Sequence, residues 1–165
     1  MKKLSLIFII FFISLSLYAQ VVDEEITLEY INRCSNYLNN PVPFNFIKTN
    51  RQTNGLYGIA DIYENQTGDI MLHVNNKNIV YFSSFGLLFT LTSAANRFHT
   101  MIFDIIETTG WEFYGKGPVD DTQIYIKNDV AAMIRPIRRR SLDNMLTVSV
   151  IFITEPNFLN YFDYK

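Results

Sequence analysis

The chain has 165 residues, a formal net charge of −2 at neutral pH and 48% hydrophobic residues. This balance excludes the general electrostatic attraction to nucleic acid or to anionic membranes that a strongly basic protein shows. With Cys34 as its single cysteine, the chain has no internal disulfide, so packing alone must hold the fold.

Residues 1–20 have the pattern of a secretory signal peptide. Two lysines precede an apolar run over residues 4–19, and small or polar residues end it. The run is shorter than the roughly 20 residues needed to cross a bilayer, so we expect cleavage and no stable membrane insertion of the mature chain. The remaining residues, 21–165, form one predicted domain, located in the periplasm or secreted.

Two segments have the spacing of amphipathic helices. From Asp23 to Leu38, apolar residues recur at intervals of three and four, Asp23 can cap the start, and the following Asn-Asn-Pro ends the pattern. Residues 91–107 combine a broad apolar face with an opposite polar face, and Gly110 supplies a left-handed stop. We therefore predict one helix at the start of the mature chain and another in its middle.

Strand signals separated by turn residues fill the rest of the chain. Four lie between the helices and four follow the second helix: 44–48, 56–63, 69–74, 78–84, 111–115, 122–127, 130–135 and 145–154. Their short connections favour antiparallel pairing. The prediction is an α+β fold with the order α-ββββ-α-ββββ, in which seven to eight strands form antiparallel sheets and both helices cover one sheet face. Duplication of a helix-plus-four-strand unit stays open, although no residues match between the halves.

The sequence contains no catalytic motif. A nucleophilic serine elbow, a phosphate-binding loop and a dinucleotide fingerprint are all missing, and two histidines are too few for a predicted metal site. Cys34 lies on the apolar stripe of the first helix, which indicates a packed thiol. Asp61 lies inside an otherwise apolar strand. Together with His73 and His99, it is a candidate catalytic residue for an alternative function, that of a small exported hydrolase. No cofactor is predicted.

The stretch "IRPIRRRSLDN" places Arg135, Arg138, Arg139 and Arg140 within six positions. Pro136 and the turn residues that follow the arginines predict an exposed connection before the last strand. Guanidinium groups suit phosphate, sulfate and carboxylate groups, so this connection is a candidate binding site. The alternative is a solvated loop that hinders sheet-edge pairing.

The tail "EPNFLNYFDYK" carries Phe158, Tyr161 and Phe162, which either dock on the domain or offer an apolar patch to another chain. The arginines, this tail and the missing catalytic motifs predict a non-catalytic binding or protein-interaction module. Its expected partner is another protein or an anionic ligand, not nucleic acid. The hydrolase, a sheet curled around an apolar ligand, and a homodimer stay open as alternatives.

Overall fold

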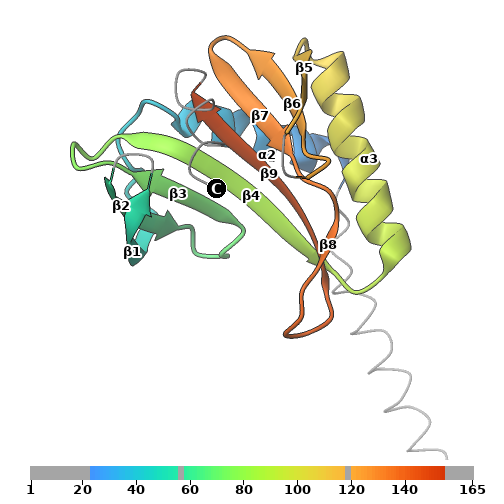
Figure 1. Cartoon of the computed structure of the whole chain (residues 1–165), viewed down its shortest axis with the longest axis horizontal. Helices are drawn as coiled ribbons and strands as arrows, with labels where there is room; N and C mark the ends of the chain where they lie inside the picture. The colour runs from blue at the N-terminus through green and yellow to red at the C-terminus, as the bar shows by residue number, and fades with distance from the viewer. Residues whose placement is uncertain (1–22, 56–57, 118–119, 155–165) are drawn as a thin grey trace, which may run out of the picture.

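The computed structural model describes residues 23–55, 58–117 and 120–154 of the chain (Figure 1). The described elements are, in chain order, α2 (Glu24–Tyr37), β1 (Ile47–Gly55), β2 (Gly58–Glu64), β3 (Ile70–Val74), β4 (Val80–Phe89), α3 (Thr92–Thr108), β5 (Glu112–Lys116), β6 (Gln123–Lys127), β7 (Val130–Ile134), β8 (Arg138–Arg139) and β9 (Leu146–Thr154). The predicted order of a helix, four strands, a second helix and a second set of strands is confirmed.

One antiparallel sheet contains all the described strands, in the order β1-β2-β3-β4-β9-β7-β6-β5, and the short strand β8 pairs with β9 beside β7. Each half of the chain is a helix followed by an antiparallel meander. The two meanders join through their last strands, β4 and β9, which lie at the centre of the sheet. The predicted α+β fold is therefore confirmed, with a single sheet.

Local chemistry explains where the helices begin and end. The Asp23 side chain caps α2 by accepting a hydrogen bond from the backbone N–H of Ile26 at 2.9 Å, and acidic residues occupy the first turn. After α3 the chain turns at Gly110, whose φ of 83° lies in the left-handed region that favours glycine. Both signals were predicted from the sequence.

The first strand differs from its prediction. β1 runs through "RQTN", which lies between the predicted strands 44–48 and 56–63, whereas Phe44, predicted to lie in the first of them, precedes β1 and is fully exposed. β1 lies at the edge of the sheet, and the part of it whose side chains are described is exposed. An edge strand can therefore be polar throughout, so the apolar pattern that marks the inner strands is missing here.

The two faces of the sheet differ in what covers them. α2 packs on β4, and α3 packs on β9 and β4. In Figure 1, α2 passes behind the strands and α3 runs along their right-hand side. Even-numbered side chains of β9, such as Val148, Val150 and Phe152, join Ile102 and Ile106 of α3 in the main core. Odd-numbered residues of β9 point the other way, toward what we call the outer face.

The outer face carries a polar half and an apolar half. Its β9 residues are Thr147, Ser149, Ile151 and Ile153, and the β4 residues paired with them are Leu88, Gly86, Ser84 and Phe82. Apolar side chains gather at one end in a second buried cluster, which includes Tyr81, Phe82, Ile124, Met133, Ile151 and Ile153. The other end of the face holds the arginines.

Candidate functional site

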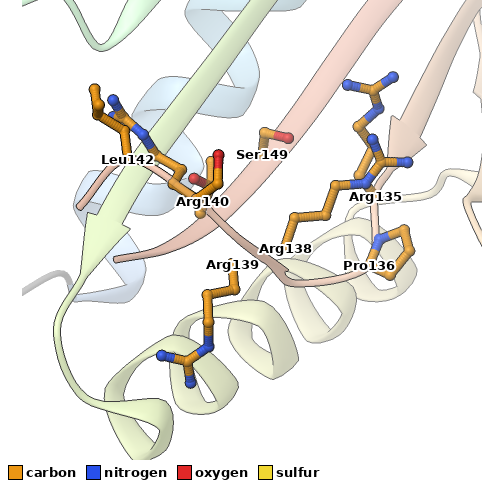
Figure 2. A pocket seen from close by; sticks show the side chains of 9 residues that line it. Arg135, Pro136, Arg138, Arg139, Arg140, Leu142 and Ser149 are labelled. Atoms are coloured by element: carbon orange, nitrogen blue, oxygen red, sulfur yellow. The ribbon is translucent and has the colours of Figure 1, made fainter. Parts of the chain in front are cut away.

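Four arginines contribute atoms to the lining of a cavity of about 400 Å³ at the polar end of the outer face. The segment that connects β7 to β9 supplies Arg135, Arg138, Arg139 and Arg140, and β9 supplies Thr147 and Ser149. Figure 2 shows Ser149 between Arg140 and Leu142 on one side and Arg135 and Arg138 on the other. The structure therefore places the predicted arginine site around a hollow instead of leaving it as an isolated loop.

Strand pairing determines which arginines face this cavity. Arg138 pairs with Thr147 of the outer face, whereas Arg139 pairs with Leu146, which belongs to the main core. Because paired residues share a sheet face, Arg138 projects to the outer face and Arg139 to the helix side. In Figure 2 the guanidinium group of Arg139 accordingly points away from Ser149.

Two of the arginines on the outer face, Arg138 and Arg140, each have an acidic neighbour. Arg138 donates a hydrogen bond to the Asp120 carboxylate, and Nε of Arg140 lies 3.6 Å from Oδ1 of Asp143. Their side chains are nevertheless 53% and 42% exposed, respectively. A guanidinium group has five N–H donors, so these contacts leave donors on both arginines for a ligand.

The acidic neighbours do not neutralise the cavity. Hydrogen bonds from Thr122, together with the positive charges of Arg138 and Arg135, hold the pKa of Asp120 below its ordinary value. Among the described residues, Arg139 forms no ion pair with a carboxylate; it donates to the backbone carbonyl of Asn144 at 3.1 Å and to its side-chain oxygen at 2.9 Å. Its positive charge is therefore not offset by a carboxylate contact within the part of the chain that the structure describes.

A second cavity, of about 290 Å³, continues from the first along the outer face. Arg135 and Ser149 line both cavities, and Met71, Phe82, Ser84, Gly86 and Ile151 are among the other lining residues of the second. Asp69 is a further lining residue, and its carboxylate accepts hydrogen bonds from Thr67, Tyr30 and Asn65. Burial opposes its charge, but these hydrogen bonds outweigh burial and lower the pKa of Asp69.

The three catalytic candidates do not converge. Asp61 pairs with Val74, which lies in the main core, whereas His73 pairs with Ile62, so their side chains leave the sheet on opposite faces. His99 lies on α3, where its Nε2 is 2.9 Å from the backbone oxygen of Arg135. The sequence candidates therefore occupy three separate environments.

Each candidate has local partners instead of a shared site. Hydrogen bonds from Arg51 and Lys48, both at 2.7 Å, lower the pKa of Asp61 to about 2. The ring of His73 stacks on Phe82 with centroids 4.3 Å apart, and burial lowers its pKa to about 4. Asp61 therefore acts as the centre of an ion-pair cluster, and His73 as a packed aromatic ring.

Ser149 lines both cavities and Gly86 lines the second one, and neither residue was predicted as a site residue. They pair across β4 and β9, and their small side chains leave open a part of the second cavity that larger side chains would fill. The sequence carries one sign of this arrangement, a small residue inside each of the apolar runs "SFGLLF" and "TVSVIF". The pattern of a single strand does not show that these two residues pair.

Several further predictions concern metal, membrane and tail. Within the described ranges, no three histidine, cysteine or acidic residues gather in a way that could hold a metal ion. None of the described helices is both long and apolar enough to span a membrane. The predicted signal peptide and the tail residues Phe158, Tyr161 and Phe162 lie outside the described residues.

No protein family, curated protein or solved structure matches the chain. Inferences about function therefore rest on the geometry and chemistry of the site itself.

Proposed function

We propose that the protein is an exported, non-catalytic binding domain that takes an anionic group into the arginine-lined cavity. The group is a phosphate, a sulfate or a carboxylate, because guanidinium donors are arranged to suit their oxygen atoms. The observation that carries the proposal is the position of Arg138 and Arg140 on either side of Ser149 over one cavity (Figure 2).

The chemistry of the lining supports an anion in preference to other ligands. Arg138 and Arg140 offer charged N–H donors, and the hydroxyl groups of Ser149 and Thr147 can donate further hydrogen bonds. Because both arginines are half-exposed, they keep much of their hydration, and binding should weaken as salt screens the charges. An acidic group of a partner protein would meet the same donors as a small anion.

The hydrolase alternative has less support. It requires Asp61, His73 and His99 to act on one substrate, yet two of them lie on opposite sheet faces and the third contacts the backbone of Arg135. Their arrangement favours structural roles.

Titration calorimetry with sodium phosphate and sodium sulfate at constant ionic strength tests the proposal. We expect saturable binding by the wild type and at least a tenfold loss in the variant Arg138→Ser/Arg140→Ser. The reason is that one hydrogen bond to a charged group contributes about 1.5–3 kcal/mol. Arg139→Ser is the control for Arg138→Ser alone, since each variant removes one positive charge from the same segment but on opposite faces.

Three outcomes distinguish the interpretations. Retained binding in Arg139→Ser supports a defined site. Equal losses in Arg139→Ser and Arg138→Ser would indicate general charge attraction. No binding by the wild type would favour the alternative interpretation of the arginines as a solvated loop. Equal urea-unfolding midpoints must show that the variants fold as the wild type does.

A further inference from the structure

Gly86 has no structural reason to be a glycine. It lies inside β4 at the centre of the sheet, where glycine normally weakens a strand. Its φ is not positive, and the pairing of β4 with β9 continues through it without a register shift. A Cβ atom at this position would lie 3.5 Å from the Cβ of Ser149, which is an ordinary contact.

What Gly86 provides is space on the outer face. Glycine inside a strand is typical of a place where a ligand approaches the backbone closely, when no bulge or bend explains it. Its partner across the sheet, Ser149, is also small, and Ser84 is the next residue of β4 on the same face. Together these three residues form the floor of the second cavity.

The side chains on this face change along its length. The pairs of β4 with β9 are, in order, Leu88 with Thr147, Gly86 with Ser149, Ser84 with Ile151, and Phe82 with Ile153, and Arg138 of β8 also pairs with Thr147. The face therefore carries an arginine and an exposed leucine at one end, small residues in the middle, and apolar residues at the other end.

The second cavity suits an uncharged group. Met71, Phe82 and Ile151 give it apolar walls, and its carboxylate, Asp69, is already held by hydrogen bonds from its own neighbours. An ionised carboxylate there would repel a second anionic group on the ligand. Of the residues that the structure describes, the one cationic side chain that lines the second cavity, Arg135, also lines the first, so the positive charge lies where the two cavities adjoin.

We propose that the ligand is an amphiphile with a single anionic head and an apolar chain. The head lies between Arg138 and Arg140, and the chain crosses the floor at Gly86 toward Met71 and Ile151. This inference rests on the proposed function, because the same arginines bind the head. It names the ligand class and identifies Gly86 as the residue that admits the chain.

A series of inorganic phosphate and butyl, hexyl and octyl phosphates, used below the concentration at which each aggregates, tests this by titration calorimetry. In the wild type the affinity should rise with chain length by up to about fourfold per methylene while the chain remains inside the cavity. In Gly86→Val we expect inorganic phosphate to bind as before and the chain-length dependence to disappear. Arg138→Ser/Arg140→Ser should weaken every member of the series.

Gly86→Ala is a milder variant that controls for a folding defect in Gly86→Val, because the Cβ atom that it adds makes only ordinary contacts. It should reduce the chain-length dependence in part. A β-branched residue is also favourable in a strand, so the unfolding midpoint of Gly86→Val should not fall.

The outcomes separate the two proposals. A flat wild-type series in which inorganic phosphate still binds overturns the amphiphile inference alone. Chain-length dependence that persists in Gly86→Val also overturns it, because the chain then lies elsewhere. If no member of the series binds, the proposed function fails as well.

Discussion

Acidification from neutral pH to about pH 5 should destabilise the fold through His73. Its ring stacks on Phe82 at 4.3 Å and meets Tyr81 edge-on at 6.2 Å, and burial lowers its pKa from 6.5 to about 4. Between these two values the unfolded chain takes up a proton that the folded chain excludes. The unfolded state then binds more protons, so the free energy of unfolding falls as the pH falls.

The size of the effect follows from the two pKa values. The loss is about 2 kcal/mol at pH 5 and levels off at about 3 kcal/mol below pH 4. Stabilising carboxylates act in a lower range. The pKa of Asp61 is about 2, and those of Asp69 and Asp120 lie below 3.8, so their contributions are lost mainly as the pH falls below about 5. Among these groups, His73 dominates the window from pH 6.5 to 5.

Urea unfolding at several pH values, followed by the fluorescence of Trp111, measures this loss. Trp111 is the only tryptophan in the chain and is 8% exposed, so its emission should change on unfolding. We expect the wild type to lose about 2 kcal/mol between neutral pH and pH 5, and His73→Gln to lose much less. Equal losses in the two proteins would refute the assignment of the pH dependence to a buried neutral imidazole.

Three further predictions address the core and the site. Because burial raises the pKa of Cys34, its thiol should resist a disulfide reagent in the native protein and react fully in urea; rapid native reaction would contradict its packed position. Ile102→Ala removes a fully buried side chain of α3 and should lower the free energy of unfolding by about 2–5 kcal/mol, measured by urea unfolding. Asp120→Asn removes the carboxylate that pairs with Arg138 and should strengthen phosphate binding by up to about fivefold in calorimetry. Weaker binding would instead make Asp120 a positioning residue for Arg138.

The sequence predicted the features of the fold that depend on local chemistry. Asp23 caps α2 as expected, and the predicted connection at Asn128-Asp129 is a turn in which both residues have positive φ, of 49° and 62°. Asparagine and aspartate tolerate this conformation better than other non-glycine residues do, which explains why the turn was readable. The order of the strands in the sheet could not be predicted from the sequence, because β4 pairs with β9 and these strands lie far apart in the chain.

The candidate site was predicted only in part. The sequence shows the cluster of four arginines within six positions directly. The direction in which their side chains point depends on the pairing of β8 with β9, which the sequence does not show. Pro136 interrupts the strand pattern before them, so the alternation that turns Arg139 away from the cavity could not be extended from β7. Gly86 and Ser149 become a common floor only after the two central strands pair.

The connection between β7 and β9 is held on two sides, which explains how a charged segment can form a site at the sheet's end. The backbone N–H of Arg135 donates to the carbonyl of Ser149 at 3.2 Å, and the carbonyl of Arg135 lies 2.9 Å from Nε2 of His99 on α3. β8 adds a further pairing with β9. Because the backbone is already fixed, binding an anion needs to order only the arginine side chains, which lowers the entropic cost of binding. His99, a candidate for catalysis in the sequence, thus supports the site through the backbone that carries the arginines.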